Sequence, residues 1–179
     1  MKHLLTIFRQ NDIFLQGTYL NRLAYRAVVV QNNLILLVKS QKYGEYKIPG
    51  GGVEGNERAF DVIKRETLEE TGYTIKSKIN PFGWTLEYAK DFEGVYDVFK
   101  QESRYYFCQV YPNPIPTNLV GFEIEYGYTP HWVTLEDAIK NNELVPTNDR
   151  IPWKERDTFV LKLLLEERDI DENQRLHQQ

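Results

Sequence analysis

The sequence predicts an α/β sandwich with a mixed β-sheet. Short apolar, strand-like runs stand both before and after a helix that contains neither Gly nor Pro, and a glycine-rich loop leads directly into that helix. Helices that alternate with hairpin strands pack on a sheet whose strands run in both directions. A chain of 179 residues with 41% hydrophobic residues can bury one full core, so we expect a single domain over residues 1–179 with its core at about 24–140.

Before the helix, the chain predicts one β-hairpin and one loop that approaches a ligand. Residues 24–40 contain two runs of β-branched and aliphatic residues on either side of Gln31-Asn32-Asn33, the pattern of a strand, a tight turn and a second strand. Residues 41–56 then interrupt the apolar pattern with five glycines and a proline. Glycines at this density permit unusual backbone angles and a close approach to a bound molecule.

The helix itself is predicted over residues 57–71. Asn56 is a residue type that caps helix starts, and Gly72 stands where helices commonly end in the left-handed conformation. We therefore expect about four turns.

After the helix, the chain predicts more sheet and two further helices. Strand-like runs cover residues 82–88, 95–99, 103–111 and 128–133. Thr134 and Asp137 resemble a capping box that opens a short helix. The apolar spacing predicts a C-terminal helix over about 154–168, followed by a polar, frayed tail at 169–179.

Composition excludes several classes of function. A net charge of -4 and a pI near 5.5 give no electrostatic reason to bind nucleic acid, and no apolar run is long enough to span a membrane. The first residues lack the pattern of a secretory signal, and Cys108 is the only cysteine, so no intrachain disulfide can form. We expect a cytoplasmic protein.

Three glutamates on the predicted helix point to a metal. Glu66, Glu69 and Glu70 fall within an arc of about 100° on a helical wheel. Like charges at this spacing cost about a few tenths of a kcal/mol per pair. Arg65 offsets them only in part, because it is a single cation. An isolated acidic helix is more often a solvated face, but the adjoining glycine loop favours a metal site.

The chemistry of such a site is hydrolysis of a diphosphate. Mg²⁺ prefers oxygen ligands and is commonly held by a few carboxylates together with substrate phosphates, and Mn²⁺ can substitute for it. A bound divalent ion neutralises phosphate charge, orients the leaving group and lowers the pKa of a bound water. The backbones of Gly51 and Gly52 would border the phosphate.

These residues resemble a known family motif, the Nudix box of MutT-like hydrolases. The matching positions are Gly51, Glu57, Arg65-Glu66, Glu69-Glu70, Gly72 and Tyr73. The resemblance covers about residues 24–140 and implies a Nudix-type α/β/α sandwich. It also implies that Glu66, Glu69 and Glu70 bind the metal, that the Gly50 carbonyl is a further ligand, and that Glu57 and Arg65 orient these groups. The first 20 residues and those after Val145 match no part of the pattern.

Some assignments stay open at this level. The general base is Glu66, Glu123 or Glu125. Tyr88 is a candidate for substrate binding at a spacing seen in dinucleoside polyphosphate hydrolases of the family, although twelve tyrosines make a chance match common. Lys39 is a candidate for a phosphate contact, with an exposed strand-end lysine as the alternative.

Other residues are given structural roles. We expect His131 to be structural, and at least one of Tyr105, Tyr106 and Phe107 to lie in the core, because neighbours on a strand face opposite sides. Thr67 departs from the family pattern, and its hydroxyl is expected to bond back to the Ile63 carbonyl.

The function predicted is Mg²⁺-dependent hydrolysis of the diphosphate linkage in a nucleoside diphosphate derivative, a small-molecule nucleotide substrate, by water attack on phosphorus. The alternative is a non-catalytic Nudix-fold sensor of a nucleotide metabolite, against which the intact box argues. A third interpretation, an isoprenoid diphosphate isomerase, requires a catalytic cysteine and would have to use Cys108. The sequence does not select the substrate or the number of metal ions. Many relatives form homodimers, and the sequence leaves the oligomeric state open.

Overall fold

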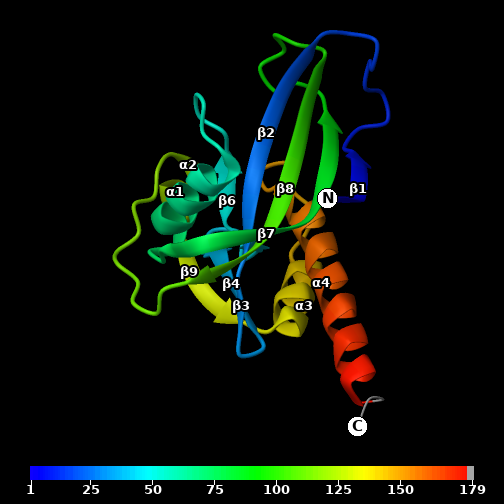
Figure 1. The fold of residues 1–179 in the computed structure, drawn as a ribbon. Helices are drawn as coiled ribbons and strands as arrows, with labels where there is room; N and C mark the ends of the chain where they lie inside the picture. The colour runs from blue at the N-terminus through cyan, green and yellow to red at the C-terminus, as the bar shows by residue number, and fades with distance from the viewer. Residues whose placement is uncertain (177–179) are drawn as a thin grey trace. The chain divides into compact units, whose positions relative to one another are not determined.

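The structure, a computed structural model, describes the backbone of residues 1–176 and side chains through residue 168. It contains two compact units that alternate along the chain (Figure 1). The first unit comprises residues 1–29 and 49–118, and the second comprises residues 30–48 and the chain from 119 onward. Each unit has its own sheet.

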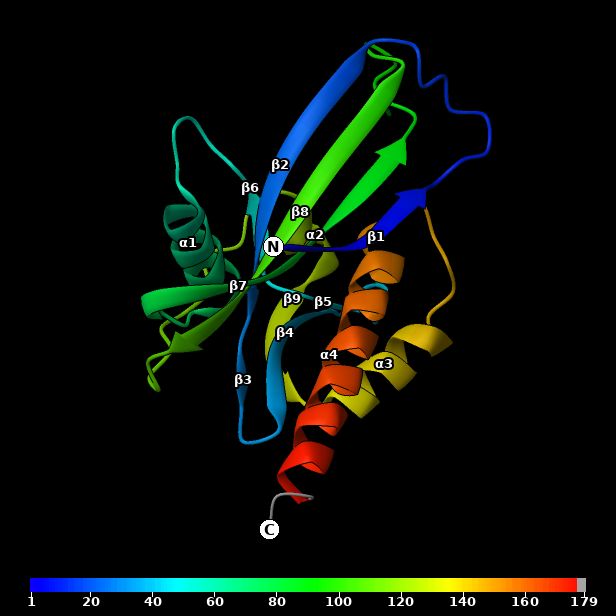
Figure 2. The ribbon, with the colours of Figure 1, turned by 45° about the vertical axis from the view of Figure 1, so that its right-hand side comes forward.

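The first unit is built on a mixed five-stranded sheet. Its strands are β1 Lys2–Phe8, β2 Tyr19–Val28, β6 Gly50–Gly52, β7 Ile75–Ala89 and β8 Val98–Val110. They lie in the order β1-β7-β8-β2-β6. The pairs β1–β7 and β2–β8 are parallel, and the pairs β7–β8 and β2–β6 are antiparallel. Figure 2 shows β2 and β8 running side by side, with β6 next to helix α1.

Helix α1, Ala59–Thr71, carries the predicted acidic face. It contacts β6, β2 and β7, and it buries Val62 and Ile63. The predicted C-terminus is confirmed, because Gly72 has a φ of 75°. The predicted cap at Asn56 is wrong. The helix begins two residues later than predicted, where the Asp61 carboxylate accepts the Arg58 backbone N–H at 3.1 Å.

The second unit is built on antiparallel strands around β4. Its elements are β3 Val30–Gln31, β4 Leu34–Ser40, β5 Tyr46–Lys47, α2 Phe122–Tyr126, β9 Tyr128–Val133, α3 Leu135–Leu144 and α4 Trp153–Leu176. The first residues of β4 pair with β3, and residues near its end pair with β5. Strand β4 also pairs with β9 along nearly its whole length. Residues 35–38 of β4 are fully buried. Helices α3 and α4 pack on each other (Figure 2).

The predicted hairpin over residues 24–40 is only partly correct. Two-residue pairing joins Val30–Gln31 to Leu34–Ile35 across a turn in which Asn32 and Asn33 have φ values of 51° and 61°. The preceding strand β2 instead pairs with β6 and β8. Apolar periodicity predicts that a strand forms but does not select its partner.

Other boundaries differ from the sequence prediction. The predicted loop at 41–56 contains the short strands β5 and β6. The predicted strands at 95–99 and 103–111 belong to one strand, β8, which begins at Val98. The strand predicted at 82–88 is part of β7, which already begins at Ile75. The C-terminal helix continues through Leu176, so the predicted frayed tail is helical up to that residue, and residues 177–179 lie outside the described chain. The Thr134 cap is confirmed, because its hydroxyl accepts the Asp137 N–H at 3.1 Å. Neither β1 nor α2 was predicted.

Within residues 1–176, none of the helices combines the length and the apolar character that crossing a membrane requires.

Candidate functional site

The glycine strand, β6, forms one wall of the candidate site. It pairs with residues 24–26 of β2. A Cβ on Gly50 would lie 2.2 Å from the Tyr25 carbonyl oxygen, and the φ of Gly50 is 135°. A Cβ on Gly51 would lie 2.1 Å from Glu66 Oε1. Gly50 is therefore required by the backbone of β2, and Gly51 by a carboxylate of α1.

The acidic face of α1, which we define as Glu66, Glu69 and Glu70, lies beside this strand. Glu70 is fully buried, and its Oε2 accepts the Gly50 N–H at 2.8 Å. A carboxylate oxygen of Glu66 and one of Glu70 lie within 4.8 Å of each other. The Glu69 side chain is 30% exposed. The three carboxylates that α1 places beside the glycine strand therefore differ in how deeply they are buried.

Arg65 connects the acidic face to Glu57. Its Nε and one terminal nitrogen donate to the two Glu57 oxygens, each at 2.8 Å. The other terminal nitrogen lies 2.7 Å from Glu66 Oε1 and 3.4 Å from Glu69 Oε2. A bidentate pair of this kind fixes geometry as well as charge. Arg65 thus links Glu57 to Glu66 and Glu69, and the orienting role of Glu57 and Arg65 stays a prediction.

The electrostatics follow from these contacts. Hydrogen bonds from Arg65 lower the pKa of Glu57 to about 2, and the same bonds raise the pKa of Arg65. Burial raises the pKa of Glu69, and the negative charge of Glu66 adds to that effect while Arg65 opposes it. The Arg65 guanidinium thus forms ion pairs with four carboxylates, those of Glu54, Glu57, Glu66 and Glu69, and its single positive charge cannot neutralise them all.

This donor set fits a hard divalent cation. All the side-chain donors of the acidic face are carboxylate oxygens, the type that Mg²⁺ prefers. Glu70 adds a fully buried carboxylate to this set, and it accepts the Gly50 N–H at 2.8 Å. The absence of a side chain at Gly51 also preserves the space that Glu66 occupies.

Arg26 is a residue of this region that the sequence prediction missed. It is 4% exposed on β2, and its guanidinium donates to the Gly50 carbonyl, the group predicted to be a metal ligand. A carbonyl oxygen has a second lone pair, so the predicted role of Gly50 stays a prediction. The available signal was the arginine itself, which interrupts the otherwise apolar run AYRAVVV.

Thr67 does not behave as predicted. Its hydroxyl is buried and has no hydrogen-bond partner within the described residues. The back-bond expected for this residue occurs one turn later, where Thr71 Oγ1 donates to the Thr67 carbonyl at 2.5 Å.

Several predicted residues belong to the second unit. The Lys39 ammonium lies 4.9 Å from the centre of the Tyr46 ring. Glu123 is buried on α2, and its Oε2 accepts the Val120 N–H at 3.0 Å. Glu125 is exposed and paired with Lys42, whose hydrogen bond lowers the pKa of Glu125. His131 Nε2 lies 3.0 Å from the Thr129 hydroxyl. The roles of Lys39, Glu123 and Glu125 in catalysis or binding stay predictions, and so does the structural role of His131.

The remaining candidates lie on β7 and β8. Tyr88 stacks on Phe8 of β1 with ring centroids 5.0 Å apart. Tyr105 is fully buried, which confirms that at least one aromatic residue of this run belongs to the core. Burial raises the pKa of Cys108 to about 12, which disfavours the thiolate that a catalytic cysteine requires.

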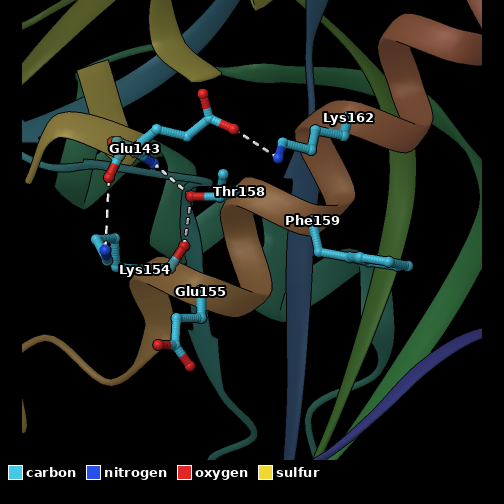
Figure 3. Close-up of a pocket in the computed structure, with 7 residues that line it drawn as sticks. Glu143, Lys154, Glu155, Thr158, Phe159 and Lys162 are labelled. Atoms are coloured by element: carbon cyan, nitrogen blue, oxygen red, sulfur yellow. Dashed lines mark hydrogen bonds and ion pairs between the residues drawn. The ribbon is translucent and has the colours of Figure 1, made fainter. Parts of the chain in front are cut away.

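A separate pocket of about 230 Å³ lies between α3 and α4 in the second unit (Figure 3). Its cations are already engaged, because Lys154 donates to the Val145 carbonyl at 2.8 Å and Lys162 lies 2.6 Å from Glu143. The lysines join the two helices, and we assign no ligand to the pocket.

Comparisons with known proteins show which family the chain resembles. The family described as NUDIX domain matches residues 20–152. Diphosphoinositol polyphosphate phosphohydrolase 2 from Rattus norvegicus is 29% identical over 113 residues, which cover 62% of this chain and 55% of that protein. The Homo sapiens protein of the same name is 28% identical over 113 residues, which cover 62% and 54%. The chain thus spans about half the length of the curated relatives it matches.

Solved structures support the fold. A NUDIX hydrolase from Nitrosomonas europaea matches with a TM-score of 0.53 and 18% identity, covering 77% of this chain and 88% of that one. A mutator MutT protein from Bacillus halodurans matches with a TM-score of 0.50 and 18% identity, covering 79% and 80%. At these identities the matches concern the fold alone, and they confirm the predicted mixed α/β class.

Proposed function

We propose that this chain, which belongs to the NUDIX domain family, is a Mg²⁺-dependent hydrolase that cleaves the diphosphate linkage of a nucleoside diphosphate derivative. The observation that carries the proposal is the acidic face of α1 against the glycine strand, organised by the Glu57–Arg65 pair. A solvated salt-bridged helix would not require a fully buried Glu70 bonded to the backbone of a neighbouring strand.

Each residue of the site has a defined task in this proposal. Glu66, Glu69 and Glu70 hold Mg²⁺, or Mn²⁺ in its place, and the Gly50 carbonyl is the further ligand. When bound, the ion supplies charge neutralisation for the diphosphate and a lowered pKa for a coordinated water. Arg65 and Glu57 keep the Glu66 and Glu69 carboxylates in place, and the side-chain-free strand Gly50–Gly52 leaves room for phosphate oxygens.

The reaction is water attack on phosphorus. The attacking oxygen forms a new P–O bond, the bridging P–O bond breaks, and a carboxylate accepts the proton of the water. Glu66, Glu123 and Glu125 are the candidate bases, and two of them are ion-paired, Glu66 with Arg65 and Glu125 with Lys42.

A second substrate class is favoured by the relatives. Their name states an action on diphosphoinositol polyphosphates, which also carry a diphosphate group. The same acidic face would serve either class, since the bond cleaved has the same chemistry. Lys39 and Tyr88 are the residues we propose for contacts beyond the reacting phosphates.

The decisive experiment measures product release from a panel with Mg²⁺ and with chelator. The panel holds nucleoside triphosphates, ADP-ribose, nucleotide sugars, dinucleoside polyphosphates and a diphosphoinositol polyphosphate. Glu69→Gln and Glu70→Gln are expected to lower turnover at least about 100-fold, as loss of electrostatic stabilisation does. Glu166→Gln, an exposed glutamate of α4, is the matched control and should retain turnover.

The outcomes separate the alternatives. Unchanged turnover in both acidic-face variants would remove the metal assignment. If no compound is cleaved but one raises the melting temperature, the protein is a non-catalytic sensor instead. Cleavage that survives the chelator would contradict the requirement for Mg²⁺.

A further inference from the structure

The side chain of Arg26 stands out because it is cationic and almost completely buried. It is 4% exposed, and it lies on β2 directly opposite Gly50 in the antiparallel ladder. A buried guanidinium is costly unless acceptors compensate for the lost hydration. The acceptor it contacts is a single backbone carbonyl, that of Gly50, while its Nε has no hydrogen-bond partner within the described residues.

Gly50 is held between two side chains of opposite charge. Its carbonyl accepts from the Arg26 guanidinium, and its N–H donates to Glu70 Oε2 at 2.8 Å. Its φ of 135° departs from the negative φ of an ordinary strand residue. The orientation of its two polar groups is therefore set by these side chains as well as by the sheet.

We propose that Arg26 is a positioning residue of the site, which fixes the Gly50 backbone so that its N–H holds the Glu70 carboxylate. The inference rests on the proposed function, because Glu70 is one of the residues assigned to the metal. Arg26 acts through Gly50. Groups that orient metal ligands from outside commonly change metal affinity by about 10- to 100-fold when they are removed.

The first test is independent of metal and substrate. The exchange rate and chemical shift of the Gly50 amide proton are measured by NMR in the wild type and in Arg26→Met, Arg26→Lys and Glu70→Gln. Arg26→Met should exchange this proton at least about 10-fold faster, and Arg26→Lys should restore part of the protection because an ammonium can still donate to the carbonyl. If Arg26→Met does not fold, Arg26→Gln takes its place.

The matched control is Arg9→Met. Arg9 is a partly buried arginine that directly follows β1 of the same sheet, but it pairs with Glu87 of β7. A general loss of sheet stability would accelerate Gly50 exchange in both arginine variants, whereas the positioning role predicts acceleration in the Arg26 variant alone.

The second test measures Mn²⁺ affinity by electron paramagnetic resonance. Arg26→Met should weaken the affinity about 10- to 100-fold, with partial rescue in Arg26→Lys and no change in Arg9→Met. An unchanged Gly50 amide together with unchanged Mn²⁺ affinity in Arg26→Met would overturn the positioning role. If the wild type binds no Mn²⁺, the proposed function fails, and the NMR result still decides whether Arg26 orients Gly50.

Discussion

Gly50 and Gly51 are sequence neighbours, but at the scale of single residues they lack a side chain for different reasons. A methyl group at Gly50 meets the backbone of β2, which cannot move away easily, and the φ of 135° is strained for any L-residue. A methyl group at Gly51 meets the end of the Glu66 side chain, which can rotate away. A substitution at Gly50 should therefore lower mainly the stability of the protein, whereas a substitution at Gly51 should lower mainly its turnover.

We expect Gly50→Ala to lower the free energy of unfolding by about 2–5 kcal/mol, from strain and collision together. Gly51→Ala should cost less than about 1.5 kcal/mol but lower Mg²⁺-dependent turnover at least about 10-fold, since it displaces the Glu66 carboxylate that we propose binds the metal. Urea unfolding and turnover assays measure both effects. Gly55→Ala, at an open position with positive φ, is the control, and full activity in Gly51→Ala would contradict the placement of Glu66.

Glu45 is a buried carboxylate of the second unit whose protonation should affect stability. Its Oε1 accepts from Trp153 Nε1 at 3.2 Å and from the Tyr128 hydroxyl at 3.4 Å, while Oε2 has no hydrogen-bond partner in the described chain. Burial raises the pKa of Glu45 above its usual value, against the lowering effect of these hydrogen bonds. The folded state therefore binds this proton more tightly than the unfolded state.

The sign of the pH effect follows by linkage. The stabilisation from the protonated carboxyl is fully present below the unfolded pKa of about 4.5 and is lost as the pH rises through the raised folded pKa. Glu45→Gln removes this titration, so its stability relative to the wild type should improve from about pH 4 to about pH 8. Urea unfolding at both pH values tests this, and a constant difference would show that Glu45 titrates normally in the folded protein.

At the scale of elements, the end of α1 is fixed by one glycine and by the segment packed over it. Gly72 has a φ of 75°, and a Cβ there would lie 1.9 Å from the Ile115 carbonyl oxygen. Gly127, which ends α2, also has positive φ, but its nearest neighbour would be the flexible Gln41 side chain at 3.2 Å.

We expect Gly72→Ala to destabilise the protein by about 2–4 kcal/mol, from the left-handed conformation plus the backbone collision. Gly127→Ala should cost only about 1 kcal/mol, because the neighbouring side chain can move. Chemical denaturation measures both. Equal losses would mean that the contact with Ile115 adds nothing to the requirement for glycine.

Elements were predicted well where their signals are local. The helix of the box, its glycine C-terminus and the Thr134 cap depend on residues within one or two turns of each other, and these are confirmed. The start of α1 was predicted at Glu57, but the Glu57 side chain bonds to Arg65 and the helix begins at Ala59. The local cap formed by Arg58 and Asp61 therefore lies two residues after the predicted cap.

At the scale of the whole molecule, metal binding should appear as stability. The three residues of the acidic face all belong to the first unit. A divalent ion that binds only the folded state at about 100 times its Kd adds about 2.7 kcal/mol to the free energy of unfolding. For a chain of this size that corresponds to a rise in Tm of roughly 5–10 °C.

Calorimetry with Mg²⁺ or Mn²⁺ and with chelator measures this rise. If the two units melt separately, the transition of the first unit should move. Glu69→Gln should lose most of the shift, while Glu166→Gln should keep it. An equal shift in Glu69→Gln would indicate that the ion binds elsewhere.

The sequence by itself determined the family motif, the helix with its acidic face and the glycine-rich segment that precedes it, because these depend on spacing along a short stretch of chain. Only the tertiary structure decided that β2 pairs with β6 and β8 instead of β4, that Arg26 reaches the Gly50 carbonyl and that Glu70 is fully buried. Sheet partners and buried contacts join residues far apart in the sequence. Local propensity sets which segments become strands, but packing and hydrogen bonding across the whole fold select their partners.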